Sequence, residues 1–293
     1  MRFMDEAIRT EVLTKVYGDI KAVDGLSLSV GRGEIFGLLG PNGAGKTTTI
    51  GMLTTVVKPT SGRGTVDGHS VADEPGAVRK SIGIVFQEFS LDTILTGREN
   101  LEMSAQLYGI PKAKRAARIN EILALVDLTE RAGSLVKTYS GGMKRRLELA
   151  RGLLHKPVVL FLDEPTLGLD PQSRKRIWEY IRDMARREKT TILLTTHYME
   201  EAEMMCDRIA IIDKGKIIAQ GSPEELKSAF GGDIVYIVSK KIDPEAIRAL
   251  PFVREVLVEG ELAKIKLESA SKNLAKLLGS ISDVESVEVR KPT

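Results

Sequence analysis

The stretch Gly40-Pro-Asn-Gly-Ala-Gly-Lys46-Thr47-Thr48 fits the pattern G-x-x-x-x-G-K-[ST] of a phosphate-binding loop, or P-loop. An apolar run at residues 34–39 is suited to a buried strand, and residues 48–53 read as the opening of a helix. A turn from strand to helix directs backbone N–H groups and a helix N-terminus at one place, which favours an anion. We therefore predict a nucleotide site in which Lys46 reaches the β- and γ-phosphates and Thr47 ligates Mg²⁺. The loop residues expected at the nucleotide are Gly40, Pro41, Asn42, Gly43, Ala44, Gly45, Lys46, Thr47 and Thr48.

The composition predicts a soluble chain with one large and one small domain. With 293 residues, 42% of them hydrophobic, the chain can bury a large core. Its net charge of +3 is too small to indicate a nucleic-acid surface by itself. The single cysteine, Cys206, excludes an internal disulfide and is expected to be a buried structural thiol. No apolar run approaches the roughly 18 residues of a membrane span, and residues 1–6 lack the apolar core of a signal peptide. Any membrane role is therefore expected to come through a partner.

Two further apolar runs end in polar side chains that suit phosphate chemistry. Val158–Leu162 is followed by Asp163 and Glu164, and Thr190–Thr195 is followed by His197. In open α/β sheets the carboxyl ends of the strands form the rim where ligands bind. Asp163 is placed to hold Mg²⁺, and Glu164 is placed to polarise an attacking water. His197 is either a hydrogen-bonded core residue or a third group at this rim.

Ser140-Gly141-Gly142 opens a second helix whose N-terminus has two interpretations. Its apolar positions, spaced 4, 3 and 4 apart, are Met143, Leu147, Ala150 and Leu154. Ser140 is a good N-cap, so this is either a capped helix or a second phosphate site. Asp170, before Pro171, is likewise a candidate N-cap.

Tyr17 and Gln87 stand at the ends of expected strands. Tyr17 follows the first of two strands with interleaved polar residues, at 7–16 and 25–30, which are expected to form an antiparallel edge. It is either a packed surface residue or a ring that stacks on adenine. Gln87 follows another apolar strand, Ser81–Phe86.

The order of elements predicts two domains. A helical block interrupts the strands, so an inserted helical subdomain is expected at about 96–156 within a first domain of residues 1–231. Beyond Gly231-Gly232, residues 232–293 follow the order β-α-β-β-α-β, which is typical of a ferredoxin-like module. That segment carries ten basic and ten acidic residues, so it is no polybasic tail. The predicted fold is an α/β P-loop NTPase (RecA-like) core with an antiparallel β edge and an inserted helical subdomain, plus a small α+β ferredoxin-like C-terminal domain.

Taken together and in this order, the motifs resemble the nucleotide-binding subunit of ABC transporters over about residues 7–230. The motifs that carry the resemblance are Tyr17, the P-loop, Gln87, Tyr139-Ser-Gly-Gly-Met143, Leu162-Asp-Glu164, Gly168-Leu-Asp170 and His197. The run Gly168–Pro171 and the small C-terminal module look like the ATPases of daunorubicin-resistance-type (ABC-2) exporters.

The resemblance implies a role for each matched residue. Tyr17 would stack on adenine, Lys46, Thr47 and Thr48 would hold phosphates and Mg²⁺, and Asp163 would support Mg²⁺. Glu164 would be the general base, His197 would contact the γ-phosphate, and Gln87 would contact Mg²⁺ and the water while relaying to the membrane partner. Ser140, Gly141 and Gly142 would bind the γ-phosphate held by the opposite subunit, with Asp170 bridging the two subunits. The usual signature, Leu-Ser-Gly-Gly-Gln, is altered at Tyr139 and Met143. We expect Met143 to pack, so that any amide contact made there in relatives is absent.

The resemblance also implies an ATPase subunit that dimerises head to tail around two ATP molecules with Mg²⁺ and drives a separate integral-membrane permease. It would be cytoplasmic, held at the inner face of the cell membrane through that permease, and export is the expected direction. A rival is a soluble ABC-type ATPase acting on nucleic acid or ribosomes. Such proteins carry paired ATPase domains or long coiled-coil insertions, whereas this chain has one P-loop and no sustained heptads. Glu164 argues against a third reading, a regulatory module with weak turnover. The transported substrate is read by the permease and is not predicted.

Overall fold

The computed structural model describes residues 6–230, 233–268 and 270–290, and the chain forms two compact units, Met1–Gln220 and Gly221–Thr293. The predicted boundary at Gly231-Gly232 lies outside the described residues. The observed division falls about ten residues earlier, so helix α8 (Pro223–Phe230) groups with the second unit. Among the described residues, the hydrophobic cluster around the P-loop strand includes residues up to Ile212, with Ile217 packed against it.

A six-stranded sheet in the order β10-β9-β3-β8-β7-β6 forms the centre of the first unit. The P-loop strand β3 (Ile35–Leu39) pairs in parallel with β8 (Thr191–Thr196) and β9 (Arg208–Asp213). Strand β7 (Val159–Asp163) pairs in parallel with β8 and with β6 (Ile82–Val85). Every residue of β3, β7 and β8 is buried, as expected for parallel strands covered on both faces. The predicted strands are therefore confirmed, with β10 (Lys216–Gly221) at the edge.

The predicted antiparallel strands form a sheet of their own rather than an edge of the central one. Its order is β2-β1-β4-β5, with β1 (Glu6–Tyr17), β2 (Ile20–Gly31), β4 (Ser61–Val66) and β5 (His69–Ser70). Helix α1 (Lys46–Leu53) contacts β2 and β4 on one side and β7 on the other. Because α1 buries Ile50, Met52 and Leu53 in one core with both sheets, it fixes the P-loop between them.

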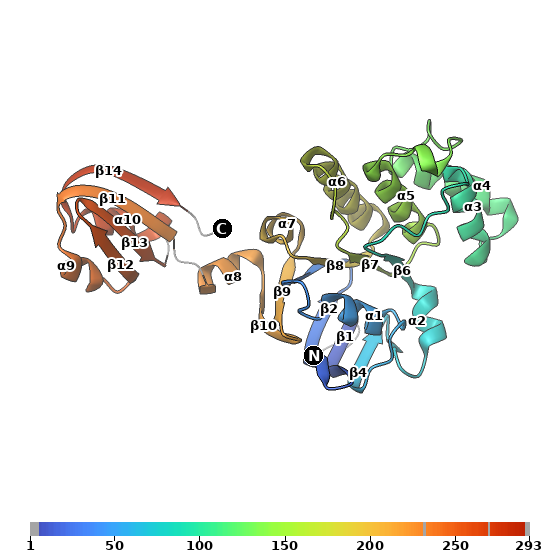
Figure 1. Ribbon diagram of the computed structural model, residues 1–293, viewed down its shortest axis with the longest axis horizontal. Coiled ribbons are helices and arrows are strands. Elements are labelled where there is room, and N and C mark those ends of the chain that lie inside the picture. Colours follow the sequence, from blue (N-terminus) through green and yellow to red (C-terminus); the bar gives the residue numbers. More distant parts are fainter. Residues whose placement is uncertain (1–5, 231–232, 269, 291–293) are drawn as a thin grey trace. The chain divides into compact units, whose positions relative to one another are not determined.

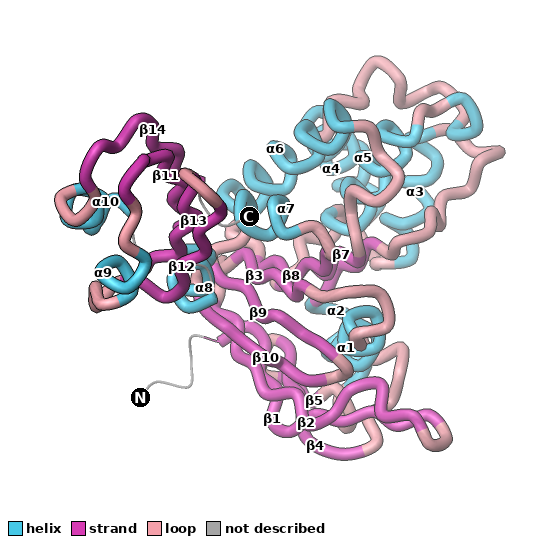
Figure 2. Tube along the Cα trace, turned by 60° about the vertical axis from the view of Figure 1, so that its left-hand side comes forward, coloured by secondary structure: helices cyan, strands magenta, loops and turns pink. Residues whose placement is uncertain are grey.

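Helices cover the opposite face of the central sheet (Figures 1 and 2). The helical subdomain comprises α3 (Gly97–Leu107), α4 (Lys112–Leu125) and α5 (Gly141–Leu153), which contact one another, with a 3-10 turn at Val136–Thr138. Helix α6 (Pro171–Glu188) contacts α5. Two short helices, α2 (Pro75–Ser81) and α7 (Met199–Met205), join strands. Cys206, just after α7, is buried, and burial raises the pKa of its thiol well above the ordinary value, as a structural cysteine requires. Among the described residues, no helix is long and apolar enough to cross a membrane.

The second unit has the β-α-β-β-α-β element order that the sequence predicts. Its sheet order is β12-β13-β11-β14, every pair antiparallel, so that β11 lies between the last two strands of the chain. The strands are β11 (Asp233–Lys241), β12 (Val253–Glu259), β13 (Leu262–Leu267) and β14 (Ser282–Arg290); the helices are α9 (Pro244–Arg248) and α10 (Ala270–Leu278). Ile247 of α9 and Leu277 of α10 are buried in one cluster with Val235 and Ile237 of β11, so both helices cover the same face.

Candidate functional site

The P-loop has a backbone that only glycine can form at its critical positions. Gly45, immediately before α1, has a φ of 104°, and a Cβ there would lie 2.4 Å from the carbonyl oxygen of Ala22. A Cβ on Gly40 would lie 2.3 Å from the carbonyl oxygen of Ile212. Lys46 folds back over the loop, donating to the carbonyl oxygens of Gly40 at 2.8 Å and Pro41 at 3.1 Å. The loop therefore places its ammonium group beside the N-terminus of α1, where both favour a phosphate.

Asp163 and Glu164, adjacent at the end of β7, make different contacts. The Asp163 carboxylate accepts hydrogen bonds from the hydroxyls of Thr195, at 2.6 Å, and Thr47, at 3.4 Å. Glu164 has a φ of 47°, a left-handed conformation that a non-glycine residue keeps only where its surroundings hold it. Its backbone N–H donates to the same Thr195 hydroxyl at 3.0 Å. Thr195 thus sets the relative positions of both acids, a role that the sequence reasoning missed.

The Glu164 carboxylate lies between two nitrogen-bearing side chains. Its Oε1 is 3.3 Å from Lys46 Nζ, and its Oε2 is 3.2 Å from His197 Nδ1. Lys46 and Glu164 are both buried, whereas the His197 side chain is 27% exposed and so can reach a bound ligand. Of the two interpretations of His197, the structure favours the group at the rim.

These side chains line a cleft of about 420 Å³. Its wall comes from chain segments far apart in sequence: Ala22, Asn42, Gly43, Gly45, Lys46, Thr47, Thr48, Gln87, Glu164, Leu167 and His197. Gln87 therefore lies in the same cleft as the P-loop residues Lys46 and Thr47. Ala22 and Leu167 were not predicted, and nothing in their local sequence marks them as site residues.

The donor set beside the P-loop fits Mg²⁺. Mg²⁺ prefers oxygen ligands, uses one or two protein groups and keeps waters and phosphate oxygens as the remainder. The Thr47 hydroxyl and the Asp163 carboxylate are already within 3.4 Å of each other, and the amide of Gln87 lines the same cleft. The three predicted metal residues are thus compatible with one nucleotide-bound ion.

Ser140, Gly141, Gly142 and Asp170 lie outside this cleft, as a second polar group. Ser140 caps α5 by accepting from Met143 N at 3.2 Å, and Asp170 caps α6 by accepting from Ser173 N at 3.0 Å. Hydrogen bonds from Ser173 lower the pKa of the Asp170 carboxyl. The two caps are neighbours, because a Cβ on Gly142 would lie 3.1 Å from Ser173 Oγ. Ser140 and Gly141 are exposed, and Met143 is half-buried.

Tyr17 is also outside the residues that line the cleft. Its side chain is 48% exposed, and Lys15 Nζ lies 4.8 Å from the centre of its ring. Tyr17 is thus an exposed ring with a cation over one face.

The buried carboxylate of Glu201 links the segment after Glu164 to the segment before His197. Glu201 accepts from the hydroxyl of Thr166 at 2.7 Å and from that of Thr196 at 2.9 Å. Thr166 follows Glu164 by two residues, and Thr196 directly precedes His197. Arg174 Nε lies 3.3 Å from the same carboxylate. Sequence reasoning missed Glu201; the available signal was an acid on the buried side of α7, beside Ala202.

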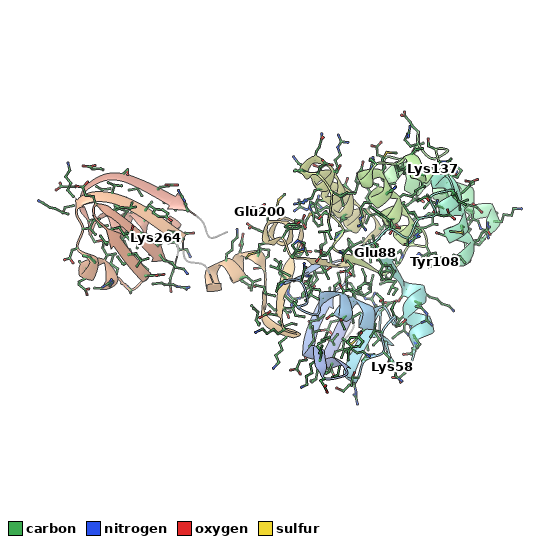
Figure 3. The ribbon with its side chains drawn as sticks, viewed as in Figure 1. Lys58, Glu88, Tyr108, Lys137, Glu200 and Lys264 are labelled. Atoms are coloured by element: carbon green, nitrogen blue, oxygen red, sulfur yellow. The ribbon has the colours of Figure 1, made fainter. Side chains whose placement is uncertain are left out.

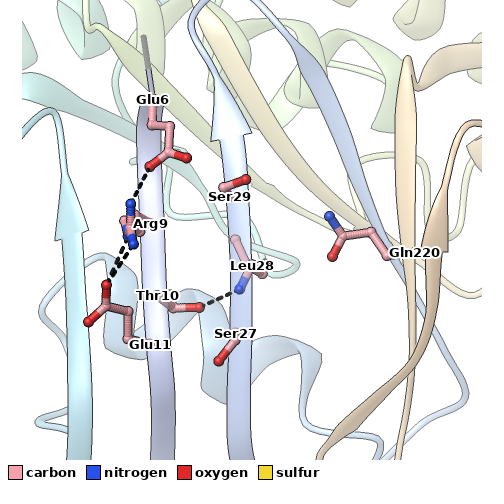
Figure 4. Close-up of a pocket in the computed structure, with 8 residues that line it drawn as sticks. All are labelled: Glu6, Arg9, Thr10, Glu11, Ser27, Leu28, Ser29 and Gln220. Atoms are coloured by element: carbon pink, nitrogen blue, oxygen red, sulfur yellow. Dashed lines mark hydrogen bonds and ion pairs between the residues drawn. The ribbon is translucent and has the colours of Figure 1, made fainter. Parts of the chain in front are cut away.

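A second cavity, of about 380 Å³, lies along β1, β2 and Gln220 of β10 (Figure 4). Its cation, Arg9, is 3.4 Å from Glu6 and 2.9 Å from Glu11, so its charge is already neutralised. The Thr10 hydroxyl accepts from Leu28 N at 2.9 Å. The pocket therefore offers little to an anion, and the P-loop cleft remains the candidate site.

Comparison with known proteins gives consistent relatives. The family described as ABC transporter matches residues 23–167. The chain is 42% identical to the daunorubicin resistance ATP-binding protein DrrA3 of Streptomyces coeruleorubidus, over 99% of this chain and 93% of that protein. It is 43% identical to the linearmycin resistance ATP-binding protein LnrL of Bacillus subtilis, over 90% of this chain and 86% of that protein.

Solved structures show the same core. CbiO1 of Clostridium perfringens, part of the ABC transporter complex cbiONQ, matches with a TM-score of 0.71 and 30% identity, over 76% of this chain and 90% of that chain. The ATP-binding cassette MJ0796, in a dimeric post-hydrolysis state bound to ADP and Pi, matches with a TM-score of 0.67 and 27% identity, over 74% of this chain and 98% of that chain.

Proposed function

Because the chain belongs to the ABC transporter family, as an ATP-binding subunit of the daunorubicin-resistance type, we propose that it works as a head-to-tail homodimer that drives a separate membrane permease. The chain is an ATPase subunit of an export-type transporter. The observation that carries the ATPase role is the cleft in which Lys46, Thr47, Glu164 and His197 converge from distant segments. Its place would be the cytoplasmic face of the membrane, through the permease.

Within the cleft the residues divide the work of phosphoryl transfer. Lys46 would bind the β- and γ-phosphates, and a phosphate there competes with Glu164 for the ammonium group. Glu164 Oε1 would then be free to accept the proton of a water that attacks the γ-phosphate in line. His197, beside Oε2, would contact the γ-phosphate from the exposed side of the cleft.

Mg²⁺ would be held by Thr47, Gln87 and Asp163 and would neutralise charge that develops on the phosphate oxygens. Asp163 is oriented for this role by Thr195, whose hydroxyl donates to it at 2.6 Å. Thr48 and the loop amides from Gly40 to Gly45 complete the phosphate contacts, and Tyr17 would stack on the adenine with its exposed ring.

The exposed N-terminus of α5 supports the dimer. Ser140, Gly141 and Gly142 present a helix N-terminus to solvent, outside the cleft of their own chain. Such an N-terminus favours an anion, and in a head-to-tail pair it would meet the γ-phosphate bound by the other copy. Asp170, beside it on α6, would bridge the two copies.

An exposed apolar surface near Gln87 supports docking of the permease. The side chains Phe86, Phe89, Ile94, Met103, Leu107 and Tyr108 are all exposed, from the loop after β6 and from α3 with its C-terminal end. Figure 3 labels Glu88 and Tyr108 in this region. Six large apolar side chains exposed within residues 86–108 favour a protein contact in this segment. A permease bound here would touch the segment that carries Gln87.

The dimer is tested by trapping ATP. In Glu164→Gln protein, light scattering should show a shift from monomer to dimer with Mg²⁺-ATP and none with ADP, because ATP binds the dimer better than the monomer. Adding Ser140→Arg should abolish the shift, since a bulky cation occupies the phosphate position, whereas Ser61→Arg, at an exposed serine of β4, should not. Dimerisation of the Ser140→Arg double variant as strong as that of the trapped protein contradicts the shared site.

A further inference from the structure

Helix α5 holds the loop that carries Gln87 through a buried arginine. Arg145 is 1% exposed, yet its guanidinium donates to the carbonyl oxygens of Phe86 at 2.7 Å and Gln87 at 2.8 Å. These two carbonyls belong to the peptide groups before and after the Gln87 Cα. Arg145 thus fixes the backbone on both sides of a residue that lines the cleft.

Two more charged side chains of α5, three and six positions further, hold the next part of the loop. Glu148 is buried, and its Oε1 accepts from Ser90 N at 2.8 Å and from Ser90 Oγ at 3.2 Å. Arg151 donates to the carbonyl oxygen of Ser90 at 2.7 Å. The residues from Phe86 to Ser90 are therefore attached to one helix at both ends.

Helix α5 is also in direct backbone contact with the strand before this loop. A Cβ on Gly83 of β6 would lie only 2.1 Å from the carbonyl oxygen of Gly152 near the end of α5. Since protein interiors are closely packed and deform little, we expect β6, the loop and α5 to move together. The N-terminus of the same helix is the exposed Ser140 cap, five residues before Arg145.

Burial of the charged Arg145 side chain is energetically unfavourable. Burial lowers the pKa of its guanidinium, with Glu148 and Asp163 acting in the opposite direction. Its Nε has no hydrogen-bond partner among the described residues. A buried charge of this kind is often less stabilising than a well-packed apolar side chain, so its two carbonyl contacts point to a task of positioning.

We propose that Arg145 is a positioning residue that couples Gln87, at the cleft of its own chain, to the α5 N-terminus that meets the nucleotide of the second chain. The inference rests on the shared-site dimer proposed above. A shift of the Ser140 cap on phosphate binding would be passed to Gln87 by a helix and a loop that move as one piece. Hydrolysis at the two sites of a dimer would be linked in this way.

The test compares two buried arginines in the full-length protein. Arg118 is the matched control, since its guanidinium also donates to two backbone carbonyl oxygens, those of Leu153 and Leu154 at 2.8 and 2.9 Å, but at the C-terminal end of α5 rather than on the Gln87 loop. We expect Arg145→Gln to lower the kcat for Mg²⁺-ATP by roughly 10-fold or more, as small misplacements at a reacting centre do, with little change in KM. Arg118→Gln should lower the melting temperature but keep kcat. Arg145→Lys keeps the positive charge but has a single side-chain nitrogen, so its kcat should lie between those of wild type and Arg145→Gln. If Arg145→Gln does not fold, Arg145→Lys is the variant to measure.

A second arm asks whether Arg145 acts through Gln87. In a Gln87→Ala background, Arg145→Gln should lower kcat little further, because the residue that it positions is already gone. In the Glu164→Gln background, Arg145→Gln should raise the ATP concentration needed for dimerisation. Effects on kcat that multiply in the double variant, or a folded Arg145 variant with wild-type kcat and wild-type dimerisation, overturn the inference. If wild-type protein does not hydrolyse ATP and Glu164→Gln protein forms no dimer with Mg²⁺-ATP, the proposed function fails instead.

Discussion

The Lys46 ammonium lies 3.3 Å from the Glu164 carboxylate, and both groups are buried. Lys46 comes from the helix after β3 and Glu164 from the loop after β7, two strands separated in the sheet by β8. The residue that would bind the γ-phosphate is therefore already the partner of the residue that would accept the proton. On our proposal a bound phosphate would replace this contact, so that the position of the ligand and the freedom of Glu164 Oε1 would change together.

Replacement of Glu164 by Gln should separate binding from hydrolysis. The amide keeps the shape of the side chain but accepts no proton, so kcat should fall by roughly 10²–10⁴, the usual contribution of a general base. ATP affinity should be retained, since Lys46 and the loop amides that would bind the phosphates are still present, although the ion pair of Lys46 with Glu164 is lost. Steady-state hydrolysis and calorimetric titration with ATP measure the two effects. The control is Glu179→Gln, at an exposed position of α6, and near-normal turnover of Glu164→Gln protein would remove Glu164 from this role.

Glu201 should be needed for the geometry of the cleft, although it does not line it. Glu201→Gln leaves one side-chain oxygen to accept from Thr166 and Thr196, so one buried hydroxyl loses its acceptor. An unsatisfied buried donor costs about 1–3 kcal/mol, and we expect a lower melting temperature together with a kcat reduced by roughly 10-fold. The exposed neighbour Glu200, labelled in Figure 3, supplies the control variant Glu200→Gln. Equal kcat for the two variants would show that Glu201 only stabilises the fold.

Gly83→Ala should destabilise the first unit. The added methyl group meets a backbone carbonyl, that of Gly152, which cannot move aside as a flexible side chain can. Overpacking of this kind costs about 1–3 kcal/mol. The only tryptophan, Trp178, is a buried residue of α6, so its fluorescence reports unfolding of this unit in urea. The control is Gly76→Ala in α2, where the new Cβ meets nothing within 4 Å. It should leave the urea concentration at the unfolding midpoint unchanged or raise it.

The first unit should fold and bind ATP without the C-terminal one. Every residue that lines the cleft lies between Ala22 and His197, and the two sheets of the first unit are complete by Gly221. A protein ending at Phe230 should therefore melt cooperatively by Trp178 fluorescence and bind ATP as the full chain does. A separate protein of residues 221–293 should fold around its own core of Val235, Ile237, Ile265 and Leu277. If the protein that ends at Phe230 is insoluble or does not bind ATP, the two units depend on each other.

The sequence by itself determined the P-loop and the strand-end acids. The loop's geometry is a local backbone property, set by glycines such as Gly45 at a φ of 104°. Asp163 and Glu164 could be assigned because parallel strands end at one edge of a sheet, so their closeness to Lys46 follows from topology alone. The element order of the second unit followed from hydrophobic periodicity, which is a local property of the sequence. The boundary predicted at Gly231-Gly232 lies outside the described residues and stays a prediction.

Only the tertiary structure decided which polar residues are buried behind the site. Glu201 and Thr166 are 35 positions apart, and Arg145 reaches the carbonyls of Phe86 and Gln87 across 59 and 58 positions. Periodicity assigns charged residues to the solvent face of a helix because desolvation of a charge is unfavourable. Periodicity cannot predict that a distant loop will supply backbone carbonyls as partners for a charged side chain on the buried face. The identity of that partner depends on how the segments pack, and packing is a property of the folded chain as a whole.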